Sequence, residues 1–156
     1  MWGGVSEILV GILALLLVVA AVWDIRTRTI PNSLNAAVAL LAIPFWWASG
    51  IDWWPDAAIH IALAAAVFGL FAVAFALGGM GGGDVKMVAA VALWLPPGAV
   101  LMLLVIMSLA GGLLTLVMLA RHRMAKSQHQ LEIPYGVAIA FGGLWLIGER
   151  FLNQFG

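Results

Sequence analysis

Long apolar stretches separated by short polar turns constrain the fold of this chain more than any other feature. A helix that spans a membrane needs roughly 20 apolar residues, and we find candidate segments at about 5–23, 34–49, 57–77, 85–95, 98–120 and 134–151. The chain is 65% hydrophobic and 9% charged, whereas a soluble domain is about half apolar and about a quarter charged. We therefore predict an all-α integral membrane protein with six transmembrane helices, forming a single domain over residues 1–156.

The fourth segment, from Val85 to Leu95, is too short to cross the hydrocarbon core alone. At about 1.5 Å per residue it covers roughly 16 Å, and Pro96-Pro97-Gly98 ends it. A glycine-rich stretch, Gly78 to Asp84, precedes it. Non-helical backbone below the membrane surface is tolerated only where it is buried in protein or lines a wet cavity. We therefore expect a glycine-rich loop of that kind at the N-terminal end of a short fourth helix.

The basic residues predict the orientation in the membrane. In a six-helix arrangement, six of the seven fall on one side, namely Arg26, Arg28, Lys86, Arg121, Arg123 and Lys126. The positive-inside rule makes that side cytoplasmic. We expect a multi-pass protein of the cytoplasmic (inner) membrane with both termini outside, and a solvated cytoplasmic loop from Arg121 to Gln130.

Two aspartates, Asp24 and Asp84, lie at the ends of apolar segments on the predicted cytoplasmic side. Two spans separate them, and because this number is even both carboxylates reach the same face. Carboxylates near hydrocarbon are costly and usually functional. An aspartic protease needs a pair that shares one proton, so that one member activates water while the other polarises the scissile carbonyl. We interpret Asp24 and Asp84 as a candidate catalytic dyad whose site faces the cytoplasm.

Residues that flank the dyad are candidates for substrate binding or support: Gly81, Gly82, Gly83, Lys86, Arg26 and Asn32. Glycines permit close approach of an extended substrate backbone to Asp84, and Asn32 is a candidate N-cap of the second helix. Each aspartate alone is explained about as well by a structural role. Asp24 could pair with a nearby arginine, and Asp84 could cap the fourth helix.

Composition excludes several other kinds of site. The chain has no cysteine, which excludes disulfides, thiolate metal sites and cysteine nucleophiles. Its three histidines are scattered and form no metal-ligand motif, so we expect no metal and no cofactor. Net charge is zero, which gives no reason to expect a nucleic-acid partner. The expected partners are membrane lipid and a peptide substrate.

The sequences around the two aspartates resemble the type IV prepilin peptidase family, membrane aspartic proteases with a Gly-x-Gly-Asp motif. Here that motif is Gly81-Gly82-Gly83-Asp84, and the family's first motif, an Asp followed by basic residues and Ile-Pro-Asn, matches Asp24 through Asn32. A third stretch, Ile133 to Ala140, is similar to the family's last-helix segment. The resemblance implies that Asp24 and Asp84 are the catalytic aspartates of an endopeptidase that cleaves the basic leader of prepilins or pseudopilins at the cytoplasmic membrane face.

The chain departs from the longer family members, which carry Cys-x-x-Cys pairs in an N-terminal region and also N-methylate the new amino terminus. It has no cysteine and begins in an apolar segment, so we expect no N-methyltransferase activity. The short form resembles peptidases of Flp-type pilus systems or of archaeal flagellin-like proteins, and we favour the Flp type.

Two other interpretations stay open at this point. A proton-coupled transporter or channel would favour symmetric halves and carboxylates near the membrane midplane, and we find no internal repeat. A catalytically silent pilus-assembly subunit is the third interpretation, and the intact aspartates argue against it.

Overall fold

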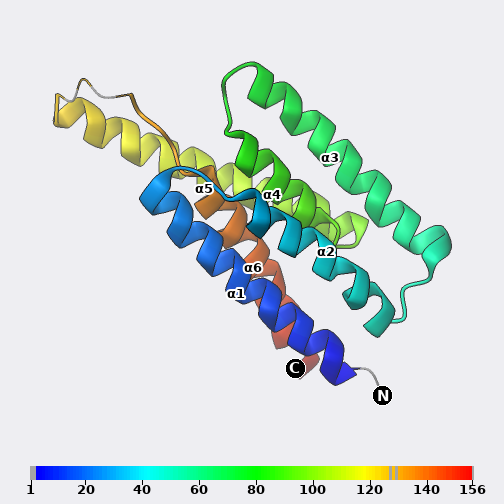
Figure 1. Cartoon of the computed structure of the whole chain (residues 1–156). Coiled ribbons are helices and arrows are strands. Elements are labelled where there is room, and N and C mark those ends of the chain that lie inside the picture. The colour runs from blue at the N-terminus through cyan, green and yellow to red at the C-terminus, as the bar shows by residue number, and fades with distance from the viewer. Residues whose placement is uncertain (1–2, 127, 129, 156) are drawn as a thin grey trace.

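The computed structural model describes residues 3–126, 128 and 130–155, which form six α-helices (Figure 1). They are α1 (Gly3–Thr27), α2 (Asn32–Ala48), α3 (Ala58–Ala76), α4 (Gly82–Ala92), α5 (Pro97–Met124) and α6 (Tyr135–Phe155). A π-helical turn, η1 (Trp53–Ala57), leads into α3. The described residues contain no β-strand, so the predicted all-α fold is confirmed.

Four of the six helices are long and apolar enough to cross a membrane: α1, α3 together with η1, α5 and α6. Helix α2 has 17 residues and α4 has 11, which correspond to about 26 Å and 16 Å of helix. The prediction of a multi-helix membrane protein is thus confirmed, but four helices rather than six have the length of a full span. The fourth helix is short, as expected.

The predicted boundaries differ from the observed ones by up to four residues, and two of these differences change the interpretation. Helix α4 begins at Gly82, three residues before the predicted start, because two glycines and Asp84 form its first turn. We had assigned these glycines to a loop because glycine is a poor helix former. Helix α5 continues to Met124, so the start of the predicted cytoplasmic loop is helical instead, with basic side chains in the last turn where the helix dipole favours them. Residues 127 and 129 of that loop lie outside the described residues.

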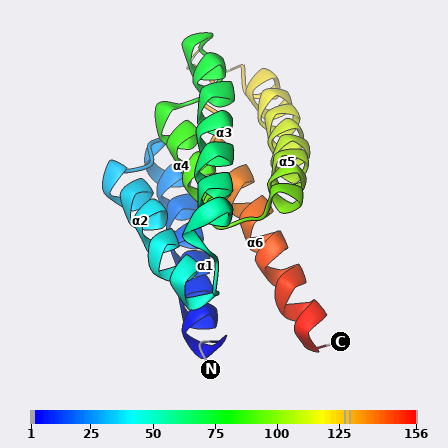
Figure 2. The same cartoon turned by 90° about the vertical axis from the view of Figure 1, so that its right-hand side faces the viewer.

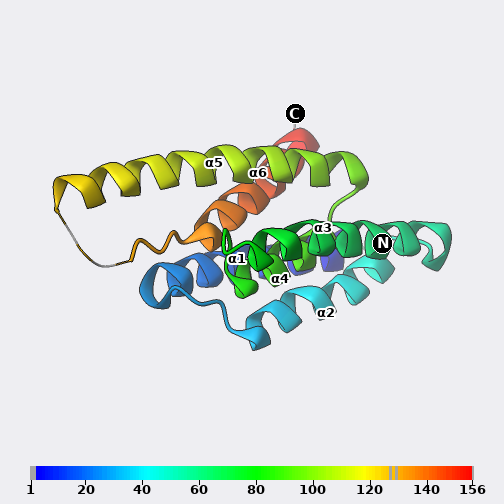
Figure 3. The same cartoon turned by 90° about the horizontal axis from the view of Figure 1, so that it is seen from above.

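Successive helices run in opposite directions along the bundle, so the C-terminal end of one helix lies near the N-terminal end of the next (Figure 1). In Figure 1 the C-terminal ends of α1, α3 and α5 lie at the same end of the bundle as the N-terminal ends of α4 and α6, and both chain termini lie at the other end. Helix α5 stands at one edge, beside α6 (Figures 2 and 3). The first end brings segments far apart in sequence together, and we call it the dyad end.

Helix α6 is the element that ties the bundle together, because α1, α4 and α5 all pack against it. Glycine allows the close approach, since a Cβ on Gly143 would lie 2.8 Å from Leu17 Cδ1 on α1. Small residues of this kind let membrane helices pack by van der Waals contact. Side chains at the centre, such as Val91 and Ile139, are almost fully buried. The position of α6 therefore fixes α1 and α4 relative to each other.

Candidate active site

Asp24 lies in the last turn of α1 and is only 3% exposed. Its Oδ2 accepts a hydrogen bond of 2.9 Å from the backbone N–H of Gly136, the second residue of α6. A buried carboxylate needs donors in place of water. The contact joins residues 112 positions apart in sequence and fixes the carboxylate of Asp24 at the start of α6.

Asp84 lies in the first turn of α4, which is not one of the four spanning helices, and is 7% exposed. Burial, and after it the negative charge of Asp24, raises the pKa of Asp84 to about 7, against the opposing effect of the backbone N–H groups of Gly81 and Gly136. The two carboxyl groups are therefore close enough to interact electrostatically. Such a pair releases its protons in two coupled steps.

The glycines before Asp84 differ in how tightly they are packed. A Cβ on Gly81 would lie 2.9 Å from Asp84 Oδ2, and a Cβ on Gly83 would lie 3.1 Å from the backbone oxygen of Ile30. A Cβ on Gly82 would meet only the ring of Phe75, at 3.4 Å or more. A side chain at the first or third position would therefore require Asp84 or the backbone at Ile30 to shift, whereas the second position has more space.

The start of α2 is held against the start of α4 by two hydrogen bonds. Asn35 Nδ2 donates to the backbone oxygen of Gly83 at 3.1 Å, and Lys86 Nζ donates to Asn32 Oδ1 at 2.8 Å. The predicted N-cap role of Asn32 was wrong, because Pro31 occupies the cap position and no side chain caps α2. Asn32 instead begins the helix and points its amide at Lys86.

Two other residues predicted to support the site, Arg26 and Lys86, form no hydrogen bond with the dyad among the described residues but lie at the same end of the bundle. Arg26 is exposed in the last turn of α1, and Lys86 is also exposed. Both positive charges therefore lie at the dyad end, where they face outward from the buried carboxylates.

Sequence reasoning missed Asn35 and Gly136 as site residues. Asn35 is buried in an apolar helix, and its Oδ1 has no hydrogen-bond partner among the residues that the structure describes. Gly136 belongs to a stretch that resembled the family's last helix, but nothing in its sequence context indicated that its N–H reaches Asp24. A polar asparagine in an apolar segment, three residues past the end of the first motif, was the one available signal for Asn35.

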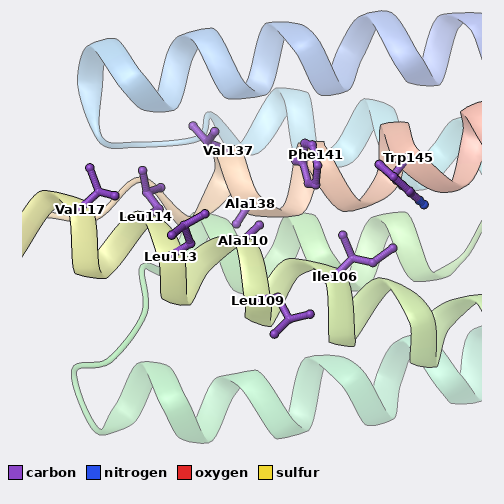
Figure 4. Close-up of a pocket in the computed structure, with 10 residues that line it drawn as sticks. All are labelled: Ile106, Leu109, Ala110, Leu113, Leu114, Val117, Val137, Ala138, Phe141 and Trp145. Atoms are coloured by element: carbon purple, nitrogen blue, oxygen red, sulfur yellow. The ribbon is translucent and has the colours of Figure 1, made fainter.

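An apolar groove of about 630 Å³ lies between α5 and α6 (Figure 4). It begins at Val137, next to Gly136, and continues along α6 to Trp145. Its lining residues carry no titratable group: Ile106, Leu109, Ala110, Leu113, Leu114, Val117, Val137, Ala138, Phe141 and Trp145. The groove can accommodate hydrocarbon but supplies no acid or base, so the chemistry of the site is confined to the dyad end.

Comparison with known proteins identifies a family for most of the chain. The model of the type IV leader peptidase family matches residues 11–116, a range that contains both aspartates and ends within α5. No curated protein matches, and no solved structure matches. Two buried carboxyl groups at one end of a membrane bundle agree with the aspartic chemistry of that family. The chain therefore belongs to the type IV leader peptidase family and is an aspartic-type prepilin peptidase.

Proposed function

We propose that this peptidase cleaves the basic leader of Flp-type prepilins or pseudopilins at the cytoplasmic face of the membrane, with Asp24 and Asp84 as its catalytic dyad. The observation that carries the proposal is the burial of both carboxyl groups at one end of the bundle, where the charge of one acts on the other. Carboxylates buried this deeply in a structural role would each be expected to have a cationic partner. Their mutual proximity instead favours catalysis.

The chemistry follows from one shared proton. The ionised carboxylate takes a proton from a water molecule, and the resulting hydroxide attacks the scissile carbonyl carbon while the protonated carboxyl donates its proton to the carbonyl oxygen. The tetrahedral intermediate then collapses and the C–N bond breaks. The carboxyl group that took the proton from water passes it to the leaving nitrogen, and the other carboxylate takes a hydroxyl proton from the intermediate, which restores the singly protonated pair. The products are a free carboxylate on the leader and a free amino terminus on the mature pilin.

The orientation of the protein in the membrane supports a cytoplasmic site. The dyad end also carries Arg26, Lys86 and the basic last turn of α5, whereas both termini lie at the opposite end (Figure 1). The positive-inside rule assigns the basic end to the cytoplasm. We infer that α2 and α4, although short, complete a six-helix topology with both termini outside.

The residues around the dyad have supporting roles in this proposal. Gly81 and Gly83 allow the close packing of Asp84 and Ile30 at the start of α4, and Gly82 leaves space there for an extended peptide. Lys86 and Asn32 form an exposed pair that joins α4 to α2, and Arg26 contributes to the positive field of the dyad end.

The pH dependence of cleavage follows from the pKa of Asp84. Because this pKa is raised to about 7, the singly protonated pair exists below that pH and loses its last proton above it. We expect the rate of cleavage to fall as the pH rises through about 7. Rates measured from pH 5 to 9 on purified enzyme in detergent test this, and a rate that stays constant up to pH 9 would contradict it.

The direct experiment is incubation of the purified protein in detergent with a synthetic peptide that contains a basic leader and the start of an apolar helix. We expect one cut, with a new amino terminus at the leader boundary, identified by mass spectrometry. A scrambled leader that keeps the same charge is the control. An intact substrate after long incubation would indicate a silent assembly subunit, and proton-driven uptake in vesicles without cleavage would indicate a transporter.

A further inference from the structure

The N-terminal end of α6 makes a direct hydrogen bond to Asp24. Gly136 N–H donates directly to Asp24 Oδ2 at 2.9 Å, and this bond is buried. The N–H groups of Gly81 and Gly136 also act on Asp84, but the burial of Asp84 and the charge of Asp24 outweigh them and raise the pKa of Asp84 to about 7. Hydrogen bonds from N–H groups stabilise the ionised form of a carboxyl group more than the neutral form. The geometry therefore favours the negative charge on Asp24.

The position of Gly136 in its helix adds to this preference. It is the second residue of a helix of 21 residues, so its N–H is one of those that no carbonyl within the helix can accept. The positive end of the helix dipole also favours an anion there. The burial of Asp24 opposes its negative charge, and the charge of Arg28, just past the end of α1, acts with the Gly136 N–H to favour it. Asp84 on α4 is the negative group that interacts with Asp24.

The backbone at Gly136 has no space for a side chain. A Cβ there would lie 2.8 Å from Asp24 Oδ2, 3.0 Å from Asp24 Cγ and 2.8 Å from Ile30 Cδ1. Real Cβ atoms essentially never approach so closely. Any side chain at this position would therefore push the carboxylate of Asp24 away from the N–H that it accepts.

We infer that Gly136 is a positioning residue whose backbone N–H keeps Asp24 ionised, so that Asp24 activates the water and Asp84 carries the shared proton to the substrate carbonyl. This assignment of roles rests on the proposed dyad. The position lies beyond the residues 11–116 that match the family, so the last helix contributes to the site through its backbone rather than through a catalytic side chain.

Three glycine variants of α6 distinguish an effect on the Asp24 carboxylate from an effect on the packing of α6 against α1. Gly136→Ala places a methyl group against Asp24. Gly143→Ala places one 2.8 Å from the side chain of Leu17, at the same α1–α6 interface but away from the dyad, and Gly148→Ala meets nothing within 4 Å. Gly143→Ala is thus the control for damaged packing and Gly148→Ala the control for the substitution itself. Thermal melting in detergent shows which variants remain folded.

The first readout is direct titration of the carboxyl groups, which needs no substrate. Aspartate labelled with ¹³C at Cγ is followed by NMR in detergent, and Asp→Asn variants assign the signals. In the wild type we expect Asp24 to ionise first and Asp84 last. In Gly136→Ala we expect the Asp24 midpoint to rise by roughly one pH unit, which corresponds to the loss of one charge-assisted hydrogen bond. The two control variants should keep the wild-type midpoints.

The second readout is the rate profile of leader cleavage, in which the acid limb of Gly136→Ala should move to higher pH by the same amount. If Asp84 ionises first, or if Gly136→Ala moves neither midpoint, the assignment is wrong. If instead the wild type titrates as expected but cleaves no leader peptide, the proposed substrate is wrong and the role of Gly136 stands. Because the titration is independent of catalysis, the two failures are distinguishable.

Discussion

Replacing Asp24 or Asp84 by asparagine is expected to lower the rate of leader cleavage by at least roughly 10²–10⁴-fold, the usual contribution of a positioned acid or base. Asparagine keeps the size of the side chain but cannot exchange a proton, so the fold is expected to remain. The measurement is the initial rate on the leader peptide, normalised to folded protein in the membrane fraction.

The double variant makes this test sharper. Because the two carboxyl groups act as a unit, removing both is expected to cost little more than removing one. Asp52→Asn is the matched control, since Asp52 is exposed in the turn before η1 at the opposite end of the bundle. Near-normal processing by either single variant of the dyad, with Asp52→Asn equally active, would exclude Asp24 and Asp84 as the catalytic pair.

Alanine substitutions along the glycine motif are expected to have unequal effects, and this is the second large prediction. Gly83→Ala places a methyl group 3.1 Å from the backbone oxygen of Ile30, and backbone cannot rotate away as a side chain can. The start of α4 must therefore shift and carry Asp84 with it. Small displacements of a catalytic group cost up to roughly 10²-fold in rate, and we expect a loss of that order.

Gly82→Ala is the matched control, because its methyl group would meet only the flexible ring of Phe75. Both glycines are in the first turn of α4, where alanine is the better helix former by about 1 kcal/mol. Helix propensity therefore predicts a small gain for both, and only packing predicts a loss for Gly83→Ala. Gly81→Ala, which meets the carboxylate of Asp84 itself, is expected to resemble Gly83→Ala. Equal rates for all three variants would contradict this packing argument.

Much of the fold could be predicted from the sequence, because a membrane helix is specified by the hydrophobicity of its own residues. Each helix contains one apolar stretch, so the number of helices and their approximate bounds followed from neighbouring residues, although α1 and α5 continue through charged residues beyond the apolar stretch. The start of α4 was misjudged, because Gly82 and Gly83 have low helix propensity but lie in a segment that Asn35 of α2 binds through the backbone oxygen of Gly83. Tertiary packing overrode propensity there.

Part of the candidate site could also be predicted from the sequence, because the cost of a buried charge is a property of the residue itself. Asp24 and Asp84 stand out because a carboxylate is costly near hydrocarbon wherever the chain places it. The role of Asn32 was misassigned, because a cap is a local expectation and the residue instead meets Lys86 from a different helix. Nothing near Asn35 in sequence shows that its amide donates to the backbone of Gly83.

By itself the sequence determined that this is an all-helical membrane protein with two aspartates at one predicted face, because hydrophobicity and charge act residue by residue. Only the tertiary structure decided how the two carboxyl groups are held. Asp24 meets Gly136 across 112 positions of sequence, and that contact depends on the packing of α1 and α4 against α6. A backbone N–H is the same in every residue except proline, so its partner is set by the fold and not by the identity of the side chain.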